Sequence, residues 1–298
     1  MAISPCVNHI DEQGRELVEH GTALFPVACY YDDLTSDPVP WHWHDELEAV
    51  IVEEGAVVFA ADHERLLLHA GEGCLVNGDV LHAAWNAEGS DCRLHSVVFH
   101  PRLVGGAVES IFWQNYVLPI IEHRSFRILR LAPSDRREAA MLTYIEEAWQ
   151  CCQSEPRGYE LQVRAALSDL LLETLECIPG RETALSAKTR RSEERMKQML
   201  ESIRNYLGEE ISVGEIARAA SISESECIRC FRNTIGVTPI KYVRQLRLQR
   251  AAELLKTTDK KIVEIGEECG FQEMSYFSRV FREQFSVTPS QYRNKKGL

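Results

Sequence analysis

The sequence contains no long uninterrupted run of apolar residues. The most apolar of its later stretches, residues 165–179, is broken by Asp169, Glu173 and Glu176, whereas a helix that spans a bilayer needs roughly 20 mainly apolar residues. Residues 1–14 also lack the basic segment and apolar core of a secretory signal peptide. We therefore expect no signal peptide, no membrane span and no membrane partner.

Regular cysteine spacing is missing as well. The chain holds 10 cysteines among its 298 residues, but they do not repeat in the pattern of a disulfide framework. Cysteines of this kind are typical of reducing compartments, where they pack as small apolar groups. The sequence therefore indicates a cytoplasmic protein.

Positive charge is scarce over the whole chain, and it is unevenly placed. The net charge of −12 would argue against a nucleic-acid partner if it were spread evenly. Residues 1–187 contain 12 Arg, no Lys and 30 acidic residues, a net charge of −18, whereas residues 188–298 contain 21 basic and 15 acidic residues, a net charge of +6. A basic module is thus joined to an acidic one. Its charge suits phosphate contact, although it also suits an ordinary solvated surface.

The apolar pattern divides the chain further. Residues 25–100 contain short apolar runs between turn residues, which is typical of a compact antiparallel sheet or barrel. Residues 134–152 and 159–178 show helical periodicity and are expected to form two antiparallel helices. Pro179 and Gly180 end the second helix, and the polar residues 181–192 have the composition of an exposed linker.

These patterns predict an α+β multidomain protein. Its expected parts are an N-terminal β-barrel domain at residues 1–130, a helical hairpin and linker at residues 131–187, and an all-α module at residues 188–298. The helical pair carries Met141, Leu142, Ile145 and Trp149 on one stripe. We expect the barrel to leave part of this stripe uncovered, which favours a homodimer formed through the hairpin.

The basic module contains an internal repeat with an offset of fifty residues. Eight residues recur in register: Ser225, Arg229, Phe231, Arg232, Val237, Thr238, Pro239 and Tyr242 as Ser275, Arg279, Phe281, Arg282, Val287, Thr288, Pro289 and Tyr292. Two copies of one structural unit explain this agreement. A solenoid for protein binding is disfavoured, because two copies are too few for a stable stack.

Each copy has the pattern of two short helices joined by a tight turn. Capping boxes at Ser212 and Ser223, each with Glu three residues later, predict helices over 213–220 and from 224 to about 234. The second copy predicts helices over 262–269 and from 274 to about 284. Thr238 and Pro239 begin a long connecting helix that runs to about residue 256. Both copies are therefore predicted to be helix-turn-helix units.

The second helix of each unit is expected to enter a major groove of double-stranded DNA. The outward residues, which we predict to contact DNA, are Ser225, Ile228, Arg229 and Arg232 in the first unit and Met274, Ser275, Tyr276, Ser278, Arg279 and Arg282 in the second. Arg229 and Arg279 are hypothesised to contact guanine edges, with phosphate contact as the alternative.

The basic module resembles the AraC/XylS family of transcription regulators. The resemblance covers roughly the last 105 residues and rests on Gly270-Phe271, Tyr276 to Arg279 and Val287 to Pro289. It implies a DNA-binding regulator, more often an activator, that responds to a small-molecule effector, commonly a carbohydrate, and acts with RNA polymerase. Lys261 departs from the pattern, since the first copy has the N-cap Ser212 there. This weakens the helix start by ~1 kcal/mol or shifts the cap to Asp259.

The acidic domain resembles the cupin family in two motifs. His42-x-His44, Glu48 and Gly55 match the first motif, and Gly71, His82 and Asn86 match the second. The resemblance implies a double-stranded barrel in which His42, His44, Glu48 and His82 ligate a divalent metal. Such a set suits zinc, nickel, manganese or iron. Asn77 and Asp79 depart from the pattern, because the second motif usually has proline and glycine there.

Spacing alone does not establish a cofactor, so two other interpretations stay open. The four residues are also compatible with a metal-free polar pocket for a sugar-sized effector, lined by Trp41, Trp43 and Trp85. A metal-dependent cupin enzyme fused to a DNA-binding module is the alternative of a different class.

Overall fold

A computed structural model describes residues 20–35, 38–61, 64–87, 89, 91–123, 125–178 and 187–294. They form two compact units, one ending at Arg190 and the other beginning at Arg191. The second half of the expected linker belongs to a helix, α5 (Ala187–Asn205); residues 179–186 lie outside the described residues. No helix in the described part of the chain has the length and apolarity that a membrane crossing requires.

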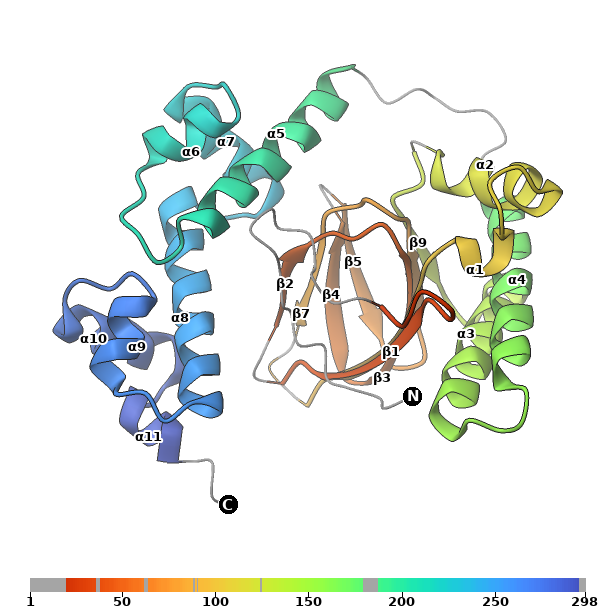
Figure 1. The fold of residues 1–298 in the computed structure, drawn as a ribbon, viewed down its shortest axis with the longest axis horizontal. Helices are drawn as coiled ribbons and strands as arrows, with labels where there is room; N and C mark the ends of the chain where they lie inside the picture. The colour runs from red at the N-terminus through yellow and green to blue at the C-terminus, as the bar shows by residue number, and fades with distance from the viewer. Residues whose placement is uncertain are drawn as a thin grey trace. The chain divides into compact units, whose positions relative to one another are not determined.

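The first unit contains two antiparallel sheets, as the sequence predicts (Figure 1). The five-stranded sheet has the order β1 (Val27–Asp33), β8 (Arg93–Phe99), β3 (Leu47–Glu54), β6 (Gly73–Val76) and β9 (Ile128–Leu131). The four-stranded sheet has the order β2 (Val39–His42), β7 (His82–Asn86), β4 (Ala56–Ala61) and β5 (Glu64–His69). Strand β9 lies outside the predicted strand region and completes the larger sheet by pairing with β6.

Alternation along β3 divides its side chains between two cores. Val50 and Val52 belong to a buried cluster that also contains Val57 and Phe59 of the smaller sheet, so the two sheets face each other. Leu47 points to the opposite side and joins a second cluster with the helices. Successive side chains of a strand point to opposite faces, and Glu48 is therefore directed between the sheets.

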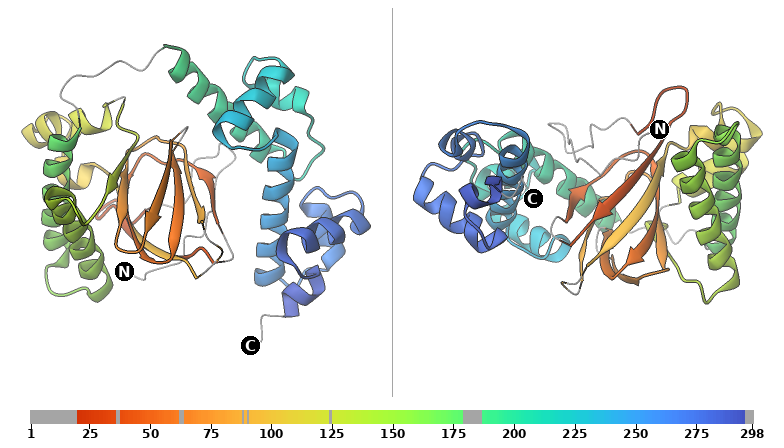
Figure 2. Two further views of the ribbon diagram at one scale, coloured as in Figure 1. Left: turned by 180° about the vertical axis from the view of Figure 1, so that it is seen from behind. Right: turned by 90° about the horizontal axis from the view of Figure 1, so that it is seen from below.

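The helical hairpin is confirmed, with α3 (Arg136–Ser154) and α4 (Tyr159–Cys177). The expectation about its apolar stripe is wrong, however. Met141 and Ile145 are completely buried in one cluster with Leu47 and Phe99, because the hairpin packs on the outer face of the five-stranded sheet (Figure 2). The same chain therefore covers the stripe, so the stripe offers no apolar surface to a second copy of the protein.

Three short helical segments between β8 and β9 have no counterpart in the sequence prediction. They are α1 (Arg102–Gly105), the π-helix η1 (Trp113–Val117) and α2 (Leu118–Ile121). Each has few residues, so hydrophobic periodicity had too short a window to reveal them.

The second unit is all helical and contains both predicted helix-turn-helix units. After α5 it comprises α6 (Val213–Ala219), α7 (Glu224–Thr234), α8 (Pro239–Thr257), α9 (Ile262–Glu268), α10 (Met274–Phe285) and α11 (Pro289–Asn294). Helices α6 and α7 form the first helix-turn-helix, and α9 and α10 form the second. Helix α8 connects them, with one unit at each end (Figure 1).

The caps explain why these helices begin where they do. Ser212 and Glu215 make both bonds of a capping box, whereas Ser223 caps Glu226 N without the reciprocal bond. Lys261 keeps the N-cap position, because the Glu264 carboxylate accepts a 2.9 Å hydrogen bond from Lys261 N. The cap therefore does not shift to Asp259.

Candidate functional site

Four predicted ligand residues converge between the two sheets. His42 ends β2 and His82 begins β7, and these two residues are paired across the strands. Glu48 lies on β3 of the other sheet, and His44 lies between β2 and β3. One ligand atom from each residue lies within 4.8 Å of those of the others. The three histidines are buried, and the Glu48 side chain is 13% exposed.

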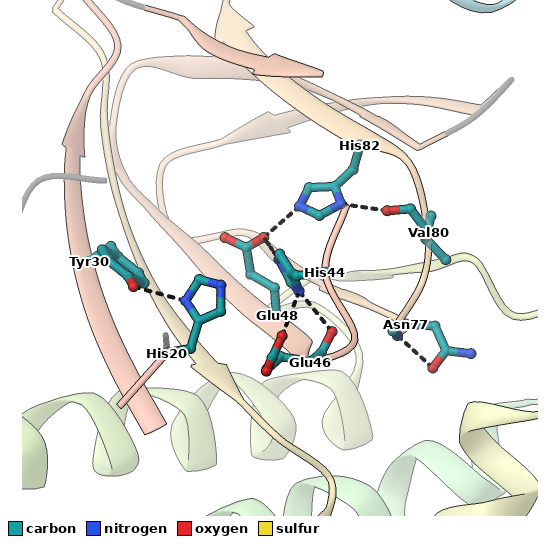
Figure 3. Close-up of polar contacts among 9 residues, drawn as sticks. His20, Tyr30, His44, Glu46, Glu48, Asn77, Val80 and His82 are labelled. Carbon is teal, nitrogen blue, oxygen red and sulfur yellow. Dashed lines mark hydrogen bonds and ion pairs between the residues drawn. The ribbon is translucent and has the colours of Figure 1, made fainter. Parts of the chain in front are cut away.

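Each imidazole is held by a backbone carbonyl. Nδ1 lies 2.8 Å from Pro40 O in His42, 3.1 Å from Glu46 O in His44 and 2.8 Å from Val80 O in His82. A carbonyl oxygen can only accept, so Nδ1 carries the proton. Nε2 of His44 and His82 is then directed towards Glu48 (Figure 3). Metal-binding histidines are typically oriented by such a bond from the other ring nitrogen.

The Glu48 carboxylate gives the cluster its charge. Burial raises the pKa of Glu48, but hydrogen bonds and charge from His44 and His82 outweigh burial and hold the pKa well below its usual range. Glu48 Oε2 lies 2.9 Å from His82 Nε2. An anionic oxygen and an imidazole lone pair would repel each other at this distance, so the contact requires a proton on Nε2 or a cation shared by both groups. Three imidazoles and one carboxylate therefore fit a divalent transition metal.

The cavity at this cluster is small. Its free volume is about 10 Å³, and apolar Phe59, Ala84, Leu94 and Val98 contribute to its lining. That space holds roughly one water molecule, so a sugar does not fit beside the histidines in this conformation. Trp41, Trp43 and Trp85 do not line the cavity, which corrects the expectation of an aromatic sugar pocket. Arg65 instead lies over the rings of Trp41 and Trp85.

His20 is a site residue that the sequence analysis missed. Its ring centroid lies 5.0 Å from that of His44, and its Nδ1 lies 2.8 Å from the Tyr30 hydroxyl. With His44 and Glu46 it forms a second group of potential ligands. His20 belongs to no motif of fixed spacing, so only the fold brings it to the cluster.

Asn77 and Asp79 stabilise the turn before His82, where the second cupin motif usually has proline and glycine. The Asn77 amide donates to Ile120 O at 3.0 Å and Phe126 O at 3.1 Å. Asp79 adopts the left-handed conformation, with φ of 59°, and its N–H donates to His44 O at 2.7 Å. The turn before His82 is thereby attached both to the histidine cluster and to the end of α2.

Replacing Asn77 with alanine is expected to lower the free energy of unfolding of the first unit by roughly 1–3 kcal/mol, because Phe126 O loses its Asn77 donor and Ile120 O keeps only the bond from His123 N. All five tryptophans lie before residue 150, so urea unfolding followed by tryptophan fluorescence reports on this unit alone. Gln150→Ala, at an exposed position of α3, is the matched control and should stay within about 0.5 kcal/mol of wild type. Equal stability of both variants would contradict the role given to Asn77.

Most of the predicted DNA-contacting residues lie on accessible faces of α7 and α10. Those exposed are Ser225, Arg229, Arg232, Ser275, Tyr276, Arg279 and Arg282, while Ile228 and Ser278 are half-buried. Met274 is a correction, because it packs against the core of the second helix-turn-helix. A Cβ on Gly266 would lie 2.6 Å from Met274 Cε. Met274 is thus half-buried and packs inward, which differs from the outward placement predicted for it.

We call α7 and α10, the second helices of the two helix-turn-helix units, the recognition helices. Their equivalent arginines, Arg229 and Arg279, have different neighbours. In α7, Arg229 forms an ion pair with Glu226. In α10, the residue equivalent to Glu226 is Tyr276, and the Arg279 guanidinium lies 5.3 Å from the centre of its ring and, through Nη1, 3.7 Å from Glu283 Oε1. Helix α7 has Glu224 and Glu226 in its first turn, whereas α10 has no acidic residue in that turn. Helix α10 thus offers the more favourable surface for phosphates.

Comparison with known families covers both units. Residues 24–196 match the family described as an AraC-like ligand binding domain, and residues 216–295 match the family described as a helix-turn-helix domain. The chain is 30% identical over 287 residues to a Bacillus subtilis strain 168 protein named as an uncharacterized HTH-type transcriptional regulator, YdeC. The match covers 95% of this chain and 97% of that protein. It is also 24% identical to the HTH-type transcriptional activator RhaS of Klebsiella pneumoniae strain 342, over 87% of this chain and 89% of RhaS.

Solved structures give weaker likenesses. An apo ToxT variant from Vibrio cholerae strain SCE256 aligns with a TM-score of 0.47 and 13% identity, over 93% of this chain and 99% of that one. An AraC-type regulator from Chromobacterium violaceum aligns with a TM-score of 0.34 and 33% identity, over 36% of this chain and 95% of that one.

Proposed function

Since the chain belongs to the AraC family of transcription regulators, we propose that its histidine cluster is the site of its small-molecule response and holds a divalent transition metal. The protein is a DNA-binding regulator with a ligand-binding domain rather than an enzyme. The observation that carries the proposal is the arrangement of His42, His44 and His82, in which each Nδ1 is bonded to a carbonyl. Imidazoles restrained in this way are ready to ligate a metal through Nε2.

Cavity size favours a metal over a carbohydrate at this site. The free space of about 10 Å³ suits one ion or water molecule and is far below the roughly 300 Å³ of the smallest drug-sized pockets. A bound metal would be held by His42, His44, Glu48 and His82 and would act as a Lewis acid towards a small ligand. Carbohydrate binding at the cluster would require the two sheets to move apart.

Elemental analysis of full-length protein purified without an affinity tag tests this proposal. We expect close to one transition metal per chain, and we expect chelation to change the affinity for DNA, because a ligand that binds one functional state better shifts the equilibrium towards that state. Metal-free protein, together with unchanged thermal stability when zinc, nickel, manganese or ferrous iron is added, would overturn it.

On the DNA side, we propose that α7 and α10 enter successive major grooves. Helix α8 has 19 residues and is therefore about 28 Å long at ~1.5 Å per residue, comparable to the ~34 Å between successive groove faces. Activation through contact with RNA polymerase is part of the proposal, supported by relatives named as transcriptional activators. Action in the cytoplasm is also proposed; the nine cysteines in the described residues are free, as is typical of a reducing compartment.

We further propose a homodimer formed through α4. Its outer face exposes Leu161 by 72% and Leu172 by 48%, and these residues lie about three helical turns apart on the same side. Leu161→Glu with Leu172→Glu is expected to convert a dimer into a monomer at micromolar concentration, because two charges would be buried in an apolar contact. Sedimentation measures the change, and Leu67→Glu, at an exposed leucine of β5, is the control. Monomeric wild-type protein would exclude the dimer.

A further inference from the structure

Arg247 lies near the middle of α8, the helix that connects the two helix-turn-helix units. Its guanidinium makes three hydrogen bonds to backbone carbonyls. Nε donates to Leu207 O at 2.8 Å, Nη1 donates to Gly270 O at 2.9 Å, and Nη2 donates to Glu209 O. Burial lowers the pKa of Arg247, so its placement costs solvation that the three carbonyls offset.

These carbonyls lie in two separate parts of the all-helical domain. Leu207 and Glu209 lie in the loop between α5 and α6, directly before the first helix-turn-helix, whereas Gly270 lies in the turn between α9 and α10, within the second helix-turn-helix. One planar guanidinium therefore connects the segment that leads into the first helix-turn-helix with the turn of the second. Its rigid fork of donors fixes their relative orientation more tightly than a single-point donor such as lysine would.

Two glycines allow the loop and the turn to approach each other. A Cβ on Gly208 would lie 2.9 Å from Glu268 O, and one on Gly270 would lie 2.8 Å from Leu207 O. Gly270 also has a φ of 79°, a conformation that favours glycine. The two units thus touch directly beside Arg247, in addition to their connection through α8.

We propose that Arg247 is a positioning residue that fixes the two recognition helices at one separation and orientation, so that the regulator accepts one spacing between the two DNA segments it reads. Helix α8 packs against each helix-turn-helix separately and shares a core with the second one through Leu248 and Leu255. The contact made by Arg247 beside Gly208 and Gly270 adds a direct connection between the two sides, which restricts their relative orientation further. This inference rests on the proposed binding of DNA by both units.

The test uses full-length protein and a duplex that the wild type selects from a randomised pool. One base pair inserted between the two contacted segments rotates them by roughly 35° and separates them by roughly 3.4 Å more. We expect the insertion to weaken wild-type binding at least about 10-fold, comparable to the loss of one good base contact. For Arg247→Ala, we expect weaker binding to the original duplex and a loss of about threefold or less on insertion.

Two further variants keep the test decisive. Gly208→Ala retains Arg247 but pushes the loop away from Glu268 O. It should therefore also reduce the loss of binding caused by the inserted base pair, and it provides this test even if Arg247→Ala does not fold. Arg250→Ala removes another arginine of α8, one paired with Glu253, and should keep the wild-type spacing penalty. A penalty unchanged in both Arg247→Ala and Gly208→Ala would overturn the inference. Wild-type protein that selects no sequence would instead contradict the proposed DNA binding.

Discussion

His82→Ala is expected to yield protein without bound metal and to lower the affinity for added zinc by at least about 100-fold. His82 is buried, and its Nε2 lies 2.9 Å from Glu48 Oε2, so alanine removes a ligand and leaves the carboxylate without that partner. Loss of residues that merely orient a metal ligand costs about 10- to 100-fold in affinity, and loss of a ligand itself should cost more. Competition with a chromophoric chelator measures the affinity, and elemental analysis measures the content.

The matched control is His69→Ala, which removes an exposed histidine of β5 from the same sheet and should leave metal affinity unchanged. Circular dichroism of both variants checks that the sheets remain folded. Full metal content in His82→Ala would remove this residue from the site. Metal-free wild-type protein whose response to its effector survives both His44→Ala and His82→Ala would contradict the metal site and the polar-pocket alternative together.

Arg279→Ala is expected to weaken DNA binding by about 5- to 150-fold, which corresponds to ~1–3 kcal/mol. Arg279 projects from α10 and lies over the Tyr276 ring. Arg229→Ala is expected to have a smaller effect, because DNA binding must first separate Arg229 from Glu226, a closer ion pair than the 3.7 Å contact between Arg279 and Glu283. Fluorescence anisotropy with the selected duplex, at one fixed salt concentration, measures both.

The pattern of the Arg279 effect identifies its contact. A base contact predicts that the loss is confined to one position of the duplex, whereas a phosphate contact predicts an equal loss on all sequences and a salt slope reduced by about one. Glu226→Gln is the complementary variant and should strengthen binding by releasing Arg229. No loss with Arg279→Ala on any DNA would remove this residue from the interface. A larger loss of affinity with Arg229→Ala than with Arg279→Ala would refute the proposal that α10 contributes more to DNA binding than α7.

The sequence alone determined the two helix-turn-helix units and the quartet of potential ligands. Helix starts at Ser212 and Ser223 were predictable because a capping side chain binds a backbone N–H only three residues away. His42 and His44 were predicted to share one side because side chains alternate along an extended strand. These are local interactions, which neighbouring residues specify without the rest of the fold.

Tertiary structure decided which surfaces are covered and how much space is left between the sheets. The apolar stripe that includes Met141 was expected to contact a second copy of the chain, but the sheet of the same chain covers it. Met274 turns inward because Gly266 leaves room for it. His20 reaches the cluster, and Arg247 joins two units, through contacts between residues far apart in the sequence. Periodicity shows which face of a helix or strand is apolar, but the packing partner of that face depends on how segments distant in the sequence meet.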